Sequence, residues 1–253
     1  MSMQHEHKPG FTYSGDELEG MQDMPFYQAA ILHEFKPYLR GNVLEVGAGL
    51  GAFSRLIQPM CQHLTLVEPD AQNAAFLAQT MGDKAGVRVQ QTAIETLLNA
   101  TPEAPYDAVV MINLLEHLAQ DGEVLSRLRQ QMTPTGALLI FVPALPALYS
   151  AMDRKLGHVC RYGRRQLSEV VTGAGFQVNR VRWFDLVGMV PWYLLYTLKG
   201  SRVMDARMSK IYDRWVMSWQ GPLERWLPPP VGKNLVLVAT PLHNNHAERG
   251  IKG

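Results

Sequence analysis

A glycine-rich loop early in the chain has the composition of an anion-binding loop. Residues 47–51 read GAGLG, follow a short apolar strand over 43–46 and precede a helix predicted over 53–57. This arrangement presents backbone N–H groups and the positive end of a helix dipole, which suit a pyrophosphate or a carboxylate. Glu68 lies 21 residues after Gly47, at the end of the next predicted strand, where an acidic side chain can accept hydrogen bonds from two ribose hydroxyls. The pair therefore predicts a cofactor that contains adenosine.

Two histidines and an arginine could act on a substrate at this cofactor. A histidine with an unperturbed pKa of about 6.5 suits proton removal near neutral pH, so we predict His158 as a catalytic base. His117, which follows the fourth predicted strand, is a second candidate for that role. Arg161 can hold a carboxylate or a phosphate through charge-assisted hydrogen bonds. His158 and Arg161 would share a face in a helical turn. The alternative is that these residues only hold a loop in place.

The segment around His158 is strongly cationic. Five Lys or Arg residues fall between positions 154 and 165. We expect a pocket for an anionic substrate there, while a solvated charged loop is the alternative. The predicted substrate contacts are Tyr149, Asp153, Arg161 and Tyr162.

Alternating strands and helices must position these residues. Such alternation, with right-handed crossovers, gives a doubly wound α/β fold with a mostly parallel sheet. Open sheets of this kind bind ligands at the carboxyl ends of their strands, so the segment after the fifth strand lies over the cofactor. The seven predicted strands cover 43–46, 64–67, 87–90, 106–112, 137–142, 176–183 and 235–240.

Helix boundaries follow from capping residues and proline. Asp70 is predicted to cap a helix that runs to Met81, and Asp121 to cap one that runs to Met132. An amphipathic helix is predicted over 24–39, with its end disturbed by Pro37.

We predict a single domain over residues 1–253. The tract over 184–230 is rich in tryptophan and has cations after its apolar run over 186–198, which is shorter than the ~20 residues of a membrane-spanning helix. We favour a lid over an apolar substrate pocket, with a membrane-surface helix or a dimer interface as alternatives. The predicted parts are an N-terminal helical cover (1–40), a cofactor-binding core (41–183), a helical, aromatic lid insertion (184–230), and a last strand with a tail (231–253).

Composition excludes several classes of function. The net charge of +1 argues against a general nucleic-acid binder. Two cysteines, Cys61 and Cys160, form neither a disulfide framework nor a zinc motif, and no metal site is predicted. The polar start of the chain shows no signal peptide, so we expect a cytoplasmic protein.

The glycine loop alone leaves the cofactor open. Gly47, Gly49 and Ala52 satisfy the dinucleotide pattern G-x-G-x-x-A, so a nicotinamide-dependent oxidoreductase is an alternative. Glu45 within the preceding strand, and a compact loop that suits an amino-acid carboxylate, favour S-adenosyl-L-methionine instead. No Tyr-x-x-x-Lys pair follows the fourth strand, which also argues against the oxidoreductase.

Three motifs in this order resemble those of class I S-adenosylmethionine-dependent methyltransferases. They are VLEVGAGLG over 43–51, LVEPD over 66–70 and YDAVVMINLLEHL over 106–118, and the resemblance extends over 43–175. It implies the Rossmann-like methyltransferase fold. The run YSGDELE over 13–19 and GHVCRY over 157–162, a Gly-His-x-x-Arg-Tyr motif, resemble one branch of the family that is found beside envelope sugar and lipid enzymes.

The resemblance implies a role for each matching residue. The backbone of the glycine loop would face the methionine part of the cofactor, and Glu45 would orient that loop or the cofactor's amino group. Glu68 would hold the ribose. The implied cofactor-binding set is Tyr13, Tyr27, Glu45, Gly47, Ala48, Gly49, Gly51, Glu68, Pro69, Asp70, Thr92, Ala93, Asn113 and Leu114.

Together these observations predict methyl transfer from S-adenosyl-L-methionine to a small or lipid-like acceptor, at oxygen because a base is available. The acceptor would be anionic or partly apolar. A cofactor-binding module without catalysis, in an envelope-biosynthesis assembly, is the other alternative. No nucleic-acid partner is expected, peripheral membrane contact stays open, and the protein would be a monomer or a homodimer.

Overall fold

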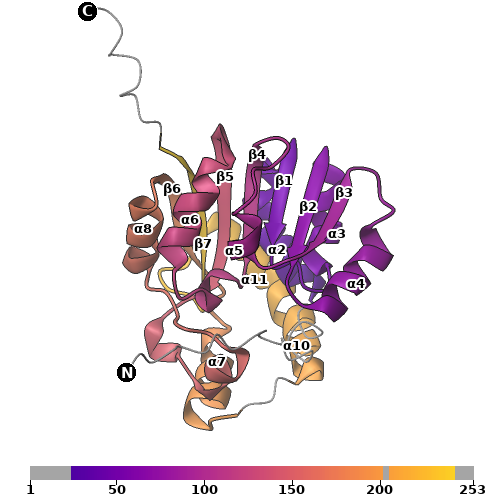
Figure 1. Cartoon of the computed structure of the whole chain (residues 1–253). Coiled ribbons are helices and arrows are strands. Elements are labelled where there is room, and N and C mark those ends of the chain that lie inside the picture. The colour runs from indigo at the N-terminus through magenta and orange to yellow at the C-terminus, as the bar shows by residue number, and fades with distance from the viewer. Residues whose placement is uncertain (1–23, 202–204, 243–253) are drawn as a thin grey trace, which may run out of the picture.

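A seven-stranded sheet forms the centre of the computed structural model, which describes residues 24–201 and 205–242. The strand order is β3-β2-β1-β4-β5-β7-β6 (Figure 1). Strands β1 to β5 pair in parallel, whereas β7 runs antiparallel to both β5 and β6. The mostly parallel, doubly wound sheet is therefore confirmed. The strands are β1 (Asn42–Val46), β2 (His63–Glu68), β3 (Val87–Gln91), β4 (Tyr106–Ile112), β5 (Met132–Pro143), β6 (Phe176–Phe184) and β7 (Asn234–Pro241).

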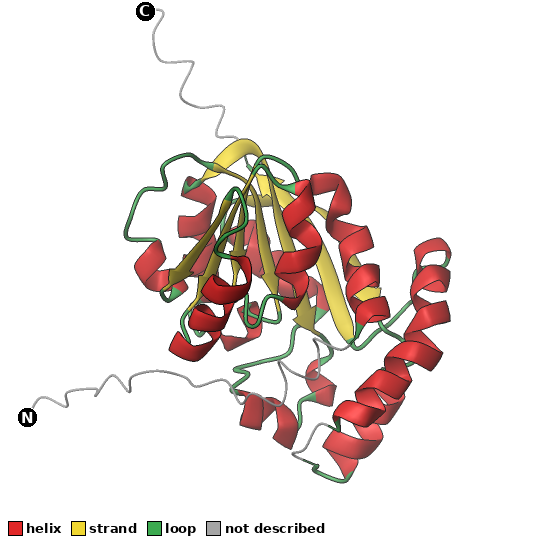
Figure 2. Cartoon of the chain, turned by 90° about the vertical axis from the view of Figure 1, so that its right-hand side faces the viewer, coloured by secondary structure: helices red, strands yellow, loops and turns green. Residues whose placement is uncertain are grey.

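Helices cover both faces of this sheet (Figure 2). Successive side chains of a strand point to opposite faces, so Leu44 and Val46 join one apolar cluster while Val43 joins the other. The first cluster is closed by α5 (Ile94–Leu97), α6 (Asp121–Gln130) and α8 (Arg164–Gly173), and the second by α2 (Pro25–Phe35), α3 (Ala52–Ile57) and α4 (Ala71–Met81).

One of the two predicted caps is confirmed and the other is wrong. The Asp70 carboxylate accepts hydrogen bonds from the backbone N–H groups of Gln72 and Asn73 at the start of α4. Asp121 instead lies within the first turn of α6, which Gln120 precedes. The Asp121 carboxylate accepts a hydrogen bond from the hydroxyl of Tyr162 at 2.7 Å, a tertiary contact that competes with the local cap.

The N-terminal helix is shorter than its pattern predicts. The α-helix ends at Phe35 and continues as a 3₁₀ turn over Lys36–Tyr38, because Pro37 has no backbone N–H to donate. No side chain of its own caps α2. Instead, the Asp213 carboxylate accepts hydrogen bonds from the backbone N–H groups of Phe26 and Tyr27.

A helical insertion lies between β6 and β7, as predicted. It consists of α9 (Met189–Trp192), a π-helical stretch η5 (Tyr193–Leu198), α10 (Ala206–Tyr212), a second π-helical stretch η6 (Asp213–Met217) and α11 (Ser218–Trp226). The last three form one continuous helix on the side of the molecule (Figure 2). Within the part of the chain that the structure describes, no helix is both long and apolar enough to cross a bilayer. Short α7 (Ala151–Leu156) lies near this insertion (Figure 1).

Candidate active site

The glycine loop lies at the carboxyl end of β1 and bends sharply. Gly47, Gly49 and Gly51 have φ values of 73°, 55° and 77°, a region that side chains other than glycine rarely adopt. The N–H groups of Gly47 and Ala48 donate to the carbonyl of Val67 in β2. A Cβ on Gly47 would lie 3.1 Å from the Leu114 side chain. The glycines are therefore required both by the turn and by the close approach of the loop after β4.

Glu68 fastens this loop to the end of β2. Its carboxylate accepts hydrogen bonds from the N–H of Gly49 at 2.8 Å and the N–H of Asp70 at 3.0 Å. The side chain is buried, and burial raises the pKa of Glu68 while the two backbone donors lower it. A carboxylate oxygen has two lone pairs, so these bonds leave acceptor capacity for hydroxyl groups.

Glu45 lies below the glycine loop, on the face of β1 that α2 and α3 cover. It is buried, and this burial raises the pKa of Glu45 to about 7, with Ser54 and Arg55 acting in the opposite direction. This position fits the implied role of orienting the loop.

The remaining implied cofactor residues gather at the same edge of the sheet. Thr92 and Ala93 follow β3, and the Thr92 N–H donates to the Glu68 carbonyl. Asn113 follows β4 with a positive φ of 47°, and its neighbour Leu114 is buried against the glycine loop. Pro69 and Asp70 join β2 to α4. Backbone donors and a buried carboxylate thus fit an adenosine-containing amino acid. Tyr13 lies outside the described residues.

A second cluster centres on Asp153 in α7. Its Oδ1 lies 2.9 Å from Nδ1 of His158 and accepts a hydrogen bond from Nε of Arg161 at 2.7 Å. Its Oδ2 accepts hydrogen bonds from Ser150. Burial would raise the pKa of Asp153, but the hydrogen bonds from His158 and Ser150 and the charge of Arg161 lower it below its ordinary value. The carboxylate therefore stays charged and fixes both side chains that the sequence singled out.

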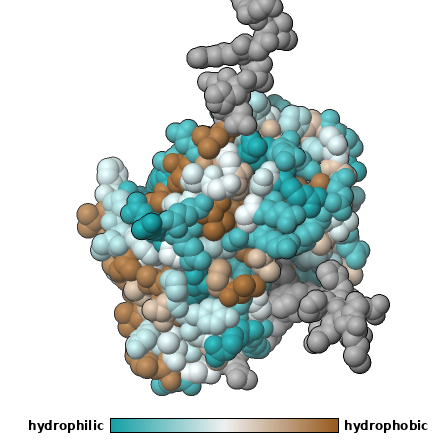
Figure 3. Space-filling view, turned by 60° about the vertical axis from the view of Figure 1, so that its left-hand side comes forward, coloured by the Kyte–Doolittle hydropathy of each residue, from teal (hydrophilic) through white to brown (hydrophobic). Residues whose placement is uncertain are grey.

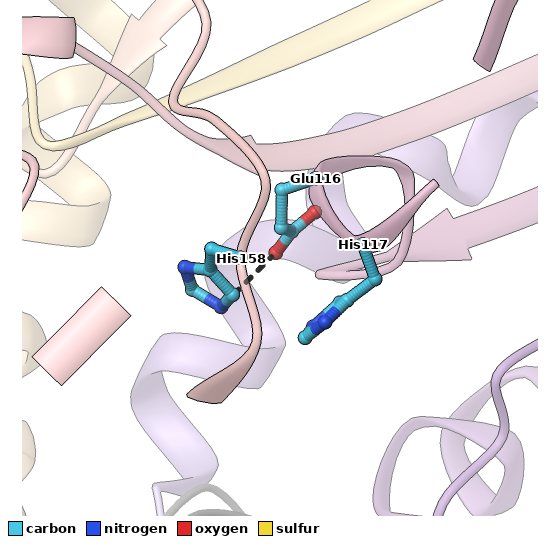
Figure 4. Close-up of side chains that lie close together, drawn as sticks. All are labelled: Glu116, His117 and His158. Atoms are coloured by element: carbon cyan, nitrogen blue, oxygen red, sulfur yellow. Dashed lines mark ion pairs between the residues drawn. The ribbon is translucent and has the colours of Figure 1, made fainter. Parts of the chain in front are cut away.

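Glu116 and His117 face His158 from the loop after β4 (Figure 4). Oε1 of Glu116 lies 3.9 Å from Nε2 of His158, and the rings of His117 and His158 meet edge to face at 4.8 Å. Burial and the nearby His158 lower the pKa of His117 to about 4, so its imidazole is neutral at physiological pH. One atom from each of the three residues lies within 4.8 Å of the others, close enough to hold a metal ion, although the sequence predicts none.

His158 and Arg161 line a cavity of about 190 Å³ beneath the helical insertion. The guanidinium of Arg161 lies 4.5 Å from the centre of the Trp192 ring. Nζ of Lys233 lies 5.4 Å from the Tyr27 ring centre and pairs with Oδ2 of buried Asp185 at 3.0 Å. Residues that shape the cavity also include Asn113, Pro191, Leu195, Tyr196, Met208 and Tyr212.

Two predicted substrate contacts are wrong as direct contacts. Tyr162 is completely buried, and its hydroxyl donates to Asp121 and to the Leu115 carbonyl in the core. Asp153 is also completely buried, and its Oδ1 contacts His158 and Arg161. The hydroxyl of Tyr149 donates to the His158 carbonyl at 2.8 Å, which makes Tyr149 a residue that holds the loop.

Other lining residues were missed by the sequence reasoning. Lys233 and Asn234 lie at the start of the last strand, and the Asn234 side chain accepts a hydrogen bond from the Tyr27 hydroxyl at 2.9 Å. Tyr27, which the resemblance assigns to the cofactor, lines this cavity together with Asn113. The antiparallel direction of β7 brings its first residues to the end where the parallel strands finish, which alternation of strands and helices alone does not predict.

Comparison with known proteins agrees with this architecture. Residues 23–181 match the family model described as a methyltransferase domain. An uncharacterized methyltransferase from Mycobacterium bovis is 31% identical over 198 residues, covering 77% of this chain and 94% of the relative. A ubiquinone biosynthesis O-methyltransferase from Azorhizobium caulinodans is 31% identical over 101 residues, so the match spans only 39% of either chain.

Solved structures show the same fold. The crystal structure of the N-methyltransferase NodS from Bradyrhizobium japonicum matches 88% of this chain and 99% of that one, with a TM-score of 0.55 and 15% identity. The fold, the family match and the glycine loop confirm the predicted cofactor over a dinucleotide. The chain therefore belongs to the methyltransferase domain family, and its domain uses S-adenosyl-L-methionine as methyl donor.

Proposed function

We propose that the protein transfers a methyl group from S-adenosyl-L-methionine to a hydroxyl of a small or lipid-like acceptor that carries an acidic group and an apolar part. The observation that carries this proposal is the Asp153–His158 pair at the wall of the cavity. A carboxylate on Nδ1 selects the tautomer whose Nε2 can accept a proton. Relatives named ubiquinone biosynthesis O-methyltransferase support oxygen as the atom methylated.

The walls of the cavity define the acceptor. Arg161 and Lys233, each paired with a buried carboxylate, are the cations of the wall, while Tyr27, Trp192 and Tyr196 provide flat apolar surface. An acidic group would bind the cations, and an aromatic or hydrocarbon part would pack on the rings.

For this reaction the protein needs to position the acceptor hydroxyl against the methyl group and to remove the hydroxyl proton. The bound cofactor supplies a methyl group already activated by its sulfonium. His158 would accept the proton of the acceptor hydroxyl as the cofactor gives up its methyl group to the acceptor oxygen. Alignment can supply ~7–11 kcal/mol, and the base typically about 10²–10⁴-fold in rate. Asn113 follows β4 beside the glycine loop and also lines the cavity, so it adjoins both ligands.

Formation of S-adenosylhomocysteine with a panel of hydroxylated aromatic acids, with and without a hydrocarbon chain, tests this function. His158→Gln should lower kcat on the order of 10²-fold and keep the cofactor Kd, because His158 lies outside the cofactor loop. His63→Gln, at the exposed start of β2, is the matched control. Loss of cofactor binding in His158→Gln would assign His158 to loop structure instead.

A substitution at Arg161 tests acceptor binding separately, through KM. Arg161→Gln should raise KM for an acidic acceptor at least about tenfold, and change KM for the corresponding amide far less. Equal changes for acid and amide would contradict a role in binding the acidic group.

The cellular setting is part of this proposal. The thiols of Cys61 and Cys160 are free, which fits the predicted cytoplasmic location. The near-neutral charge supports the expectation of no nucleic-acid partner.

A further inference from the structure

The continuous helix over residues 206–226 carries apolar side chains on its solvent side. Trp215 is 71% exposed and Trp226 is 89% exposed. Side chains three or four positions apart lie on one side of a helix, and this also holds through the wider turn of the π-helical stretch. The exposed apolar stripe, as we name it, consists of Met208, Ile211, Trp215, Trp219, Leu223 and Trp226.

The opposite side of this helix, against the protein, is mostly polar, with Met217 as its fully buried apolar side chain and Tyr212 partly buried beside it. Asp213, Gln220 and Glu224 are buried. Asp213 caps α2, and the Glu224 carboxylate accepts hydrogen bonds from the backbone N–H groups of Asp185 and Leu186 and from Gln220. Most apolar side chains of this helix therefore face solvent, unlike those of a surface helix of a soluble protein, whose apolar side faces the core. Hydrogen bonds and the packing of Met217 anchor the helix and leave the exposed apolar stripe for another surface.

The exposed charges within this helix are all positive, although exposed Asp205 caps its start. Arg207, Lys210, Arg214 and Arg225 are exposed on this helix, and its two acidic residues, Asp213 and Glu224, are the buried ones. The neighbouring segment of the insertion adds exposed Val190, Leu194 and Leu198, followed by Lys199. In Figure 3, hydrophobic residues gather along one side and the lower part of the molecule.

We propose that the exposed apolar stripe and its flanking cations dock this protein on an anionic lipid bilayer. Tryptophan prefers the boundary between water and hydrocarbon, and an apolar helix side with Lys and Arg at its border is the pattern of a helix lying in the membrane surface. A second copy of the chain fits less well. A two-fold contact through the stripe would place the cations of both copies, Arg207, Lys210, Arg214 and Arg225, in one interface, and their like charges would repel.

Docking through this helix would also place the cavity at the bilayer. Trp192 and Tyr196 from one part of the insertion, and Met208 and Tyr212 from the base of the long helix, all line the cavity. An acceptor with a hydrocarbon chain could then enter from the lipid phase. This last consequence rests on the proposed function, whereas the docking itself does not.

Flotation with phospholipid vesicles tests the docking without any methyl transfer. The full chain should co-float with vesicles of phosphatidylglycerol and phosphatidylcholine, and far less with phosphatidylcholine alone or at high salt. The triple variant Trp215→Ser, Trp219→Ser, Trp226→Ser should reduce the bound fraction at least about tenfold. Phe76→Ser, which removes an exposed aromatic from α4, is the matched control and should not change binding.

A charge variant and two further measurements complete the test. Arg207→Gln, Lys210→Gln, Arg214→Gln should lower the partition coefficient about a hundredfold, since each cation near an anionic surface contributes about fivefold. S-adenosylhomocysteine titration must give the same Kd in every variant, which shows that each is folded.

Failure of the unchanged chain to float, or equal flotation of the tryptophan variant, would refute the docking. A dimer in light scattering that becomes a monomer in the tryptophan variant would assign the stripe to a second copy. The proposed methyl transfer to a soluble acceptor does not depend on docking, so none of these outcomes bears on it.

Discussion

Nε of Arg161 donates a hydrogen bond to Oδ1 of Asp153 across 2.7 Å, and both side chains are buried. The same oxygen lies 2.9 Å from Nδ1 of His158. The predicted base and the predicted anion-binding residue are therefore held by one carboxylate, although the segment that joins them is not a helix. A change at Asp153 must affect both.

Asp153→Asn should lower the free energy of unfolding by about 3–5 kcal/mol, because it leaves the buried guanidinium of Arg161 without its counter-charge. Urea unfolding measures this loss. Asp83→Asn, at an exposed position, is the control and should change stability by less than about 0.5 kcal/mol. An Asp153→Asn protein as stable as the parent would show that the ion pair contributes nothing net.

Glu68→Ala should weaken binding of S-adenosylhomocysteine at least about tenfold. The substitution removes the acceptor for the N–H groups of Gly49 and Asp70, and hydrogen bonds to a charged group are worth about 1.5–3 kcal/mol each. Isothermal titration gives the affinity, and Glu123→Ala on exposed α6 is the control. Unchanged affinity in Glu68→Ala would contradict both the hold of Glu68 on the glycine loop and its implied contact with the ribose.

Glu45→Gln should stabilise the cofactor-free protein, and more at pH 8 than at pH 5. The folded-state pKa of Glu45 is raised from 4.5 to about 7. Between these values the folded protein holds a proton that the unfolded chain releases, so stability is lost as pH rises through this window. The gain on substitution is at most about 3 kcal/mol above pH 7. Thermal unfolding at the two pH values measures it, with Glu95→Gln as the exposed control. A pH-independent effect would contradict the raised pKa.

Asp213→Ala should destabilise the protein by about 1–2 kcal/mol, since it removes the cap of α2 and exposes two N–H groups at its positive end. Asp213→Asn keeps an acceptor and should recover about half of this loss. Both are measured by urea unfolding. Equal losses in the two variants would mean that charge, not acceptance of the hydrogen bonds, is what the helix end requires.

The cofactor part of the protein was predictable from sequence because it depends on local geometry. The glycine loop needs positive φ values within a few residues of a strand, and Glu68 ends the strand beside it. Both requirements leave residue types at fixed spacing. The Asp70 cap is local in the same way, and it was correct.

Contacts between distant segments were not predictable in this way. Asp121 was assigned to a local cap, but the buried hydroxyl of Tyr162 takes its carboxylate. Tyr162 itself was assigned to the substrate site, because the sequence does not show which side of the segment after β5 faces the core. Asp213 caps a helix far away in the chain, which no local pattern indicates.

The sequence by itself determined the sheet, the cofactor loop and the candidates His158 and Arg161, since strand periodicity, glycine spacing and side-chain chemistry are properties of short segments. Only the tertiary structure decided that Asp153 joins these two residues, that β7 brings Lys233 to the cavity, and that the helix over 206–226 turns its tryptophans outward. The physical reason is that burial and hydrogen-bond partners are set by the packing of distant segments, and an apolar pattern shows that a helix has two sides without showing which side faces the protein.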